Sequence, residues 1–129
     1  TLPTATWTTL NLDSERFDTD TIHCTVLNTG RLTATTAGVY SIVGHVAFAF
    51  SAAGTIRGVR LLLNGTTVIG SVFAHPVQLT EATKISVPAH YQLAAADYVE
   101  LQAYQDTGGN LAVVASANDS PEFAMVKVA

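Results

Sequence analysis

The sequence predicts an all-β fold built as two packed sheets. Strand-favouring Thr, Val and Ile are frequent among its 129 residues. Several stretches alternate apolar and polar residues with the period of a strand. Turn signals separate these stretches at intervals of about 8–12 residues, as in sandwiches and barrels. No domain boundary is evident, so residues 1–129 are expected to form one domain with residues 1–6 as a loose lead-in.

Residues 39–50 show the clearest alternation. The even positions are apolar and predict a core face: Tyr40, Ile42, Val46, Phe48 and Phe50. The odd positions include Ser41, Val43 and His45, which are small or weakly polar. A strand face of this kind has few groups that bind water strongly. Because contiguous exposed apolar area usually marks an interface, we expect this face to be covered by a partner.

Residues 59–73 are predicted to form a hairpin. Asn64 and Gly65 at its centre supply the two left-handed positions that a type I′ turn requires. Apolar residues flank the turn on both sides: Val59, Leu61 and Leu63 before it, and Val68, Ile69 and Val72 after it. This combination is the strongest local signal in the chain.

Four further strands follow the hairpin. Residues 84–93 alternate through Pro88, which cannot donate a ladder hydrogen bond and so predicts an edge strand or a bulge. Residues 98–105 alternate again. Residues 111–115 and 123–128 are predicted to be the last two strands.

Charge is scarce in this sequence and excludes some classes of function. Only 12% of the residues are charged, against about 25% in a typical domain. The net charge is −4, and the six Lys and Arg residues are scattered, so we expect no nucleic-acid partner. No apolar run reaches the roughly 18 residues of a spanning helix, so we expect no membrane insertion. Cys24 is the single cysteine, which rules out an internal disulfide.

Catalytic and metal signatures are weak. The four histidines form no zinc-type spacing, and His23 and Cys24, being adjacent, would point to opposite faces of a strand. Serines for a Ser-His-Asp triad exist, but no Gly-x-Ser-x-Gly elbow does. The sequence therefore predicts no enzyme, no cofactor and no metal site.

Calcium is the alternative that the loop acids leave open. The acids in question are Asp18, Asp20, Asp106, Asp119 and Glu122. Calcium needs six to eight oxygen ligands, and the sequence does not show that these carboxylates converge. We favour ordinary turn-forming acids over a calcium site. Trp7 could stack on a glycan, but we favour it as a packing residue of the first strand.

Several segments resemble the complement C-one-q/tumour necrosis factor superfamily. Residues 38–42, Gly-Val-Tyr-Ser-Ile, resemble its Gly-x-Tyr-x-Phe strand signature. Residues 93–101 resemble its Leu-x-x-Gly-Asp-x-Val-x-Leu segment, with Ala96 in place of Gly. Residues 120–125 resemble its closing strand. Two more segments, residues 17–20 and 31–34, resemble the opening strands of a bacterial and bacteriophage branch.

This resemblance implies a ten-stranded, two-sheet jelly roll that forms a homotrimer. The inner sheets of such trimers surround a three-fold axis. If the resemblance holds, the strands around Val43 and Ser86 both belong to the inner sheet. The residues expected at the trimer interface are then Ser41, Val43, His45, Ser86, Pro88 and His90.

The resemblance also implies a function. We expect a non-enzymatic trimeric structural or binding head of a bacteriophage virion, as a tail or capsid component, or of a bacterial surface assembly. Its partners would be copies of itself, other virion or surface proteins, and a cell-surface protein or glycan. Its location would be the virion or the cell exterior. The alternatives are a receptor- or carbohydrate-binding module and, less favoured, a hydrolase on a jelly-roll scaffold. A fold warrants an architecture more firmly than a function.

Overall fold

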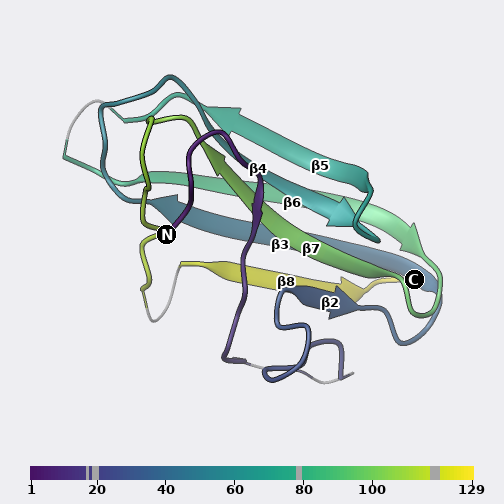
Figure 1. Ribbon diagram of the computed structural model, residues 1–129. Coiled ribbons are helices and arrows are strands. Elements are labelled where there is room, and N and C mark those ends of the chain that lie inside the picture. The colour runs from purple at the N-terminus through teal and green to yellow at the C-terminus, as the bar shows by residue number, and fades with distance from the viewer. Residues whose placement is uncertain (17, 19–20, 78–79, 117–119) are drawn as a thin grey trace.

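The computed structural model describes residues 1–16, 18, 21–77, 80–116 and 120–129. These residues form strands and no helix, which confirms the all-β class (Figure 1). Eight strands are present, fewer than the ten that the resemblance implied. They are β1 (Thr8–Thr9), β2 (Arg31–Thr33), β3 (Gly38–Phe48), β4 (Arg57–Leu63), β5 (Thr67–Ala74), β6 (Thr83–Leu93), β7 (Tyr98–Gln105) and β8 (Glu122–Lys127).

The strands form two antiparallel sheets. The larger sheet has the order β1-β7-β4-β5, and β2 also pairs with β7. The smaller sheet has the order β6-β3-β8. Figure 1 shows that the connections β3–β4, β5–β6 and β7–β8 leave from one end of the sandwich, called here the loop end. The tight connections β4–β5 and β6–β7 lie at the opposite end, the turn end. This arrangement is a sandwich compatible with a jelly roll.

The core lies between the two sheets and follows the alternation of the sequence. On β3 the even positions from Tyr40 to Phe48 other than Gly44 fill it, as expected, whereas Phe50 lies beyond the strand and is exposed. Opposite them, the larger sheet contributes alternate residues of β4 and β7: Val59, Leu61, Val99, Leu101 and Ala103. Burial of these side chains removes apolar area from water and supplies most of the driving force for folding.

The predicted hairpin is present. Asn64 and Gly65 have φ angles of 51° and 74°, as a type I′ turn requires. The Asn64 side chain also accepts a hydrogen bond from the Tyr98 amide at 3.0 Å and donates one to Asp97 at 3.0 Å. The β4–β5 turn is thereby joined to the β6–β7 turn. In that second turn Ala96, which stands where the motif it resembles has glycine, has a φ of 73°.

Two expectations about local structure were wrong. Residues 111–115 form isolated bridges, Leu2 with Leu111 and Phe48 with Val113, and not a strand. Residues 1–6 are not a loose lead-in, because Leu2 is only 1% exposed and sits in the core. The bridge to Leu111 and a bond from the Gln105 side chain to the Leu2 carbonyl fix this segment to the loop end.

Pro88 lies where its chemistry predicts. It belongs to β6, which pairs with β3 alone and is an edge of the smaller sheet. Residues 31–33 of the resemblance form β2, while residues 17, 19 and 20 lie outside the described residues. Nowhere in the described chain is there a helix long and apolar enough to cross a membrane.

Candidate functional site

The six residues expected at a trimer interface lie together on one face of the smaller sheet. In the register of β3 with β6, Ser41 is opposite His90, Val43 is opposite Pro88, and His45 is opposite Ser86. Directly paired residues of antiparallel strands point to the same face. Because the neighbouring residues Ile42 and Val87 are buried in the core, this face is the outer one. Whether it is an interface stays a prediction.

Strand β8 extends this face by two residues that the sequence did not suggest. Ala124 is opposite Val43, and Val126 is opposite Ser41. Alternation alone would place Phe123 and Met125 on one side of β8 and these residues on the other. It could not show which strand β8 pairs with, because pairing partners are set by tertiary structure.

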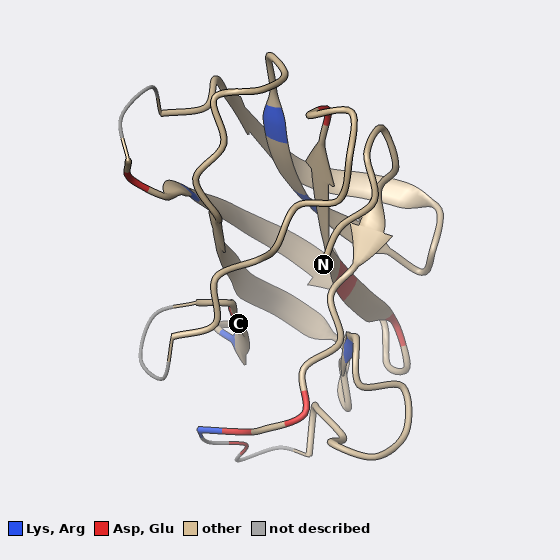
Figure 2. Cartoon of the chain, turned by 60° about the vertical axis from the view of Figure 1, so that its left-hand side comes forward, with Lys and Arg blue, Asp and Glu red and all other residues tan. Residues whose placement is uncertain are grey.

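We call this surface, made of Ser41, Val43, His45, Ser86, Pro88, His90, Ala124 and Val126, the outer β3 face. Its valines are exposed, Val43 by 44% and Val126 by 58%. Its charged neighbours along the same strands are Lys84 on β6 and Glu122 on β8. Figure 2 shows how sparse charge is, with long stretches of strand that carry none. Because this face is exposed and carries almost no charge, its removal from water in an interface costs little free energy.

One row of the smaller sheet aligns a serine, a histidine and a carboxylate, a combination that catalytic triads also use. His45 lies between Ser86 on β6 and Glu122 on β8. The His45 Nδ1 and Ser86 Oγ atoms are 2.5 Å apart and share a hydrogen bond. Glu122 instead pairs with Arg16, whose Nη2 is 2.6 Å from its carboxylate. Because the carboxylate is engaged by Arg16, the row holds a Ser–His pair next to a neutralised acid.

A cavity of about 1380 Å³ runs beside this row, between β8 and the N-terminal segment. Leu10, Leu12 and Arg16 line it from the N-terminal side, and Glu122 and Phe123 line it from β8. Strand β8 pairs only with β3, so its other edge carries backbone groups without a ladder partner in the described chain. The sandwich is therefore open along β8.

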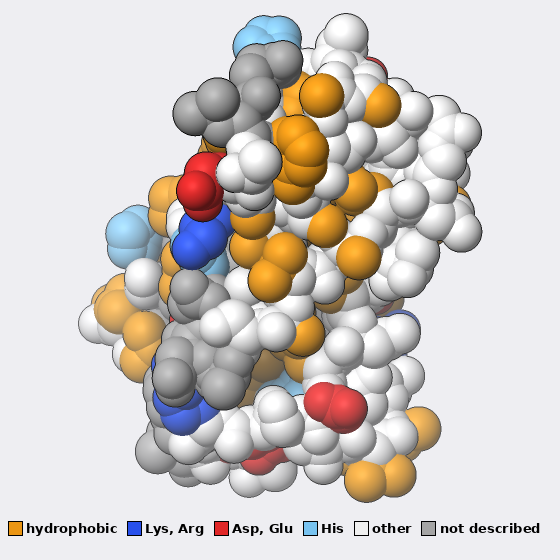
Figure 3. All heavy atoms as spheres, turned by 90° about the vertical axis from the view of Figure 1, so that its left-hand side faces the viewer, with side chains coloured by type: hydrophobic (Ala, Val, Ile, Leu, Met, Phe, Trp, Pro, Cys, Tyr) orange, Lys and Arg blue, Asp and Glu red, His pale blue; other side chains and the backbone are white. Residues whose placement is uncertain are grey.

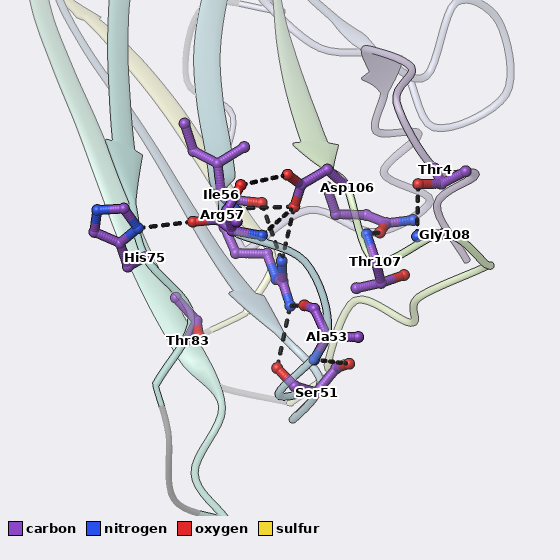
Figure 4. Close-up of polar contacts among 12 residues, drawn as sticks. Thr4, Ser51, Ala53, Ile56, Arg57, His75, Thr83, Asp106, Thr107 and Gly108 are labelled. Carbon is purple, nitrogen blue, oxygen red and sulfur yellow. Dashed lines mark hydrogen bonds and ion pairs between the residues drawn. The ribbon is translucent and has the colours of Figure 1, made fainter.

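A buried arginine organises the loop end (Figure 4). Arg57 is fully buried and donates hydrogen bonds to the carbonyls of Ser51, Ala53 and Ile56. Its Nη1 is 3.5 Å from the carboxylate of Asp106. Burial lowers the pKa of the Arg57 guanidinium, and the charge of Asp106 partly restores it. Arg57 thereby supports the β3–β4 connection.

Asp106, the residue that follows β7, completes the same network. Its carboxylate accepts hydrogen bonds from the amides of Ile56 and Thr55 and from the Thr55 hydroxyl. These bonds and the Arg57 charge lower the pKa of Asp106 despite its partial burial. In the end-on view of Figure 3, apolar side chains gather in the middle of the loop end and charged ones are few. The network holds the loop end together through the bonds of Asp106 and the terminal nitrogens of Arg57, while the buried Arg57 Nε has no hydrogen-bond partner in the described chain.

Each loop acid considered for calcium that the structure describes has protein partners of its own. Asp18 accepts hydrogen bonds from the amides of Ile22 and His23, Asp106 serves the loop end, and Glu122 pairs with Arg16. Asp20 and Asp119 lie outside the described residues. Among the described residues no group of three or more His, Cys, Asp or Glu side chains is placed to hold a metal ion.

The remaining reactive side chains lie in two places, because His23 and Cys24 line one small pocket and His75 lies beside Thr55. His23 contacts Glu15 and the Thr29 carbonyl, and His75 contacts the Thr55 carbonyl. Cys24 is exposed, and hydrogen bonds from the amides of Leu27 and Val26 lower the pKa of its thiol. None of these is placed near the His45–Ser86 pair by a hydrogen bond or ion pair in the described chain.

Comparison with known proteins assigns no family, since the chain matches no protein-family model and no curated protein.

Proposed function

We propose that this chain is a non-enzymatic head domain that works as a homotrimer. The observation that carries the proposal is the outer β3 face. It combines exposed Val43 and Val126 with a lack of charge at its centre. Contiguous exposed apolar surface on a soluble domain usually marks an interface. A second and third copy of the same chain are the partners that the resemblance to the complement C-one-q/tumour necrosis factor superfamily favours.

The same resemblance supports the finer features of the proposal. The fold would be a jelly roll of that superfamily, which has ten strands where the structure describes eight. The trimer would form the tip of a phage tail or capsid component, or of a bacterial surface assembly. Its partners would be other virion or surface proteins. The small number of charges and the two-sheet sandwich are compatible with this role.

The proposal is tested by placing a charge at the centre of the face. Val43→Glu would bury an unpaired carboxylate in each interface, which costs several kcal/mol. We expect sedimentation equilibrium to give a monomer mass for Val43→Glu with an unchanged far-ultraviolet circular dichroism spectrum. The matched control is Val68→Glu on β5, since Val68 is 46% exposed and lies in the other sheet. The control is expected to stay trimeric, and an intact Val43→Glu trimer would exclude this face.

A hydrolase is the second candidate, and the His45–Ser86 hydrogen bond is the observation that favours it. A serine bonded to an imidazole is the usual arrangement of an activated nucleophile. Turnover of p-nitrophenyl acetate by the wild type, lost in Ser86→Ala, would support the hydrolase over the head domain. Equal rates for the two proteins would leave Ser86 without a catalytic role.

A further inference from the structure

The outer face of the larger sheet carries a continuous strip of aromatic side chains. Tyr104 on β7 and Phe73 on β5 are both opposite Gly58 on β4. The Trp7 ring lies between them, 5.3 Å from the Tyr104 ring and 5.8 Å from the Phe73 ring by centroid. Phe73 is 51% exposed. We call Trp7, Phe73 and Tyr104 the aromatic strip.

Gly58 makes this strip possible. A Cβ atom at Gly58 would lie 2.7 Å from the Phe73 ring and 3.0 Å from the Trp7 ring. Both distances are shorter than a carbon–carbon contact allows. With no side chain at this point of β4, the rings lie directly over the sheet backbone. The strip is thus supported from below by a rigid strand.

A row of polar side chains runs beside the strip. Arg60 donates from Nε to the side-chain oxygen Oε1 of Gln102 at 2.8 Å, and Gln102 Nε2 donates to the Thr9 hydroxyl at 2.9 Å. The guanidinium carbon of Arg60 lies 4.2 Å from the centroid of the Trp7 ring. The hydrogen-bond chain and the stacking contact together fix the plane of the guanidinium.

The fixed guanidinium has no anionic partner. Within the described chain no carboxylate lies at ion-pair distance from Arg60, and its terminal amino groups donate no hydrogen bond. Burial lowers the pKa of Arg60, and no acidic group opposes this effect. Arg60 therefore presents two oriented donors beside an exposed aromatic surface.

We propose that the aromatic strip and Arg60 bind a carboxylate-bearing sugar of a cell-surface glycan. The C–H bonds of a pyranose ring form an apolar face that stacks on aromatic rings. A carboxylate accepts two parallel hydrogen bonds from a guanidinium. Trp7, Phe73 and Tyr104 supply the first surface and Arg60 supplies the second group. The complementarity of charge between Arg60 and the ligand selects an acidic sugar over a neutral one.

Other ligand classes fit this surface less well. Single-stranded nucleic acid also stacks on aromatic rings, but it needs a positively charged track, and the net charge of this chain is −4. A peptide added as a strand would bind the backbone groups along the edge of β5, whereas the aromatic rings lie on the face of the sheet, across β7, β4 and β5.

The inference is independent of the trimer. The strip lies on the larger sheet, and the outer β3 face lies on the smaller one. A failure of glycan binding leaves the oligomeric state untouched, and a monomeric wild type leaves the strip intact.

Trp7 is the single tryptophan of the chain, so its fluorescence reports on the strip directly. The experiment titrates the wild-type protein with sialyllactose and with lactose, which lacks the whole sialic acid residue and with it the carboxylate. We expect sialyllactose to change the Trp7 emission and to bind about tenfold or more tighter than lactose, as one charge-assisted pair provides. The absence of any change with sialyllactose would overturn the proposal.

Variants separate the site from a general effect of charge. Arg60→Gln is expected to lower the affinity for sialyllactose to that for lactose, and Phe73→Ala is expected to weaken both. Arg31→Gln is the matched control, because Arg31 also stacks on a ring of this sheet, that of Tyr98 at 3.9 Å, away from the strip. Equal losses in Arg60→Gln and Arg31→Gln would contradict the assignment. So would an emission change with oligothymidylate that sialyllactose does not produce.

Discussion

The backbone φ angle at a position determines which amino acids that position accepts without strain. Ala96 has a φ of 73°, in the left-handed region, which costs an L-residue about 1–2 kcal/mol and costs glycine almost nothing. We expect Ala96→Gly to stabilise the protein by roughly 1 kcal/mol, less the entropy that glycine adds to the unfolded chain. Thermal denaturation measures this change. A lower Tm for Ala96→Gly would show that the turn does not store this strain.

The charge of Asp106 should make the stability of the protein depend on pH. The hydrogen bonds to Asp106 from Ile56 and Thr55, with the nearby Arg57, lower its pKa in the folded state. Because the pKa of Asp106 is lower in the folded state, its ionised carboxylate stabilises the fold at pH values above the ordinary aspartate pKa of about 3.9. This contribution is lost as the pH falls through the folded-state pKa. The wild type should therefore exceed Asp106→Asn in stability at neutral pH. Urea denaturation across acidic pH should show this advantage shrinking below about pH 4. A stability difference between the wild type and Asp106→Asn that does not change with pH would exclude a role for the Asp106 charge.

Among the elements, those with strong local chemistry could be predicted from the sequence. Asn64 and Gly65 define their turn because few residues accept a positive φ, and Pro88 marks an edge because it lacks an amide hydrogen. The inner and outer faces of β3 follow from alternation alone. In each of these cases the information lies within a few neighbouring residues.

Elements that depend on distant partners could not be predicted. The apolar residues at 111–115 indicate a strand, but Leu111 is used in a single bridge to Leu2, more than a hundred residues away. The aromatic strip also depends on contacts between residues that are distant in sequence. Trp7, Phe73 and Tyr104 are far apart in sequence, and only the pairing of three strands places them together over Gly58. Trp7 could be assigned to packing from the sequence, but its ring neighbours could not.

Strand β4 provides a test of how the strip is supported. Gly58→Ala places a methyl group within contact of the Phe73 and Trp7 rings, which must then move away from the sheet. We expect a loss of about 1–3 kcal/mol in stability and a red shift of the Trp7 emission as the ring becomes more exposed. Gly109→Ala is the control, because no atom lies within 4 Å of its added Cβ. Identical emission spectra for Gly58→Ala and the wild type would mean that the rings do not rest on β4.

At the scale of the whole molecule, the two sheets differ in the surfaces they present. The smaller sheet presents a face with little charge, centred on Val43. The larger sheet presents aromatic rings beside Arg60, which has no ion-pair partner among the described residues. Self-association through the first face would leave the second face available to ligands. A trimer would then carry three equivalent sites, and avidity would strengthen binding to a surface that displays many glycans.

The molar mass of the wild-type protein tests the central claim most directly. Light scattering on the eluting peak, at micromolar protein, is predicted to give three times the chain mass of 13.5 kDa. In the proposed trimer each interface would bury the outer β3 face, and dilution should lower the mass only at concentrations where the trimer dissociates. A single species of 13.5 kDa at every concentration would contradict the account, because the exposed face of β3 would then have no copy to cover it.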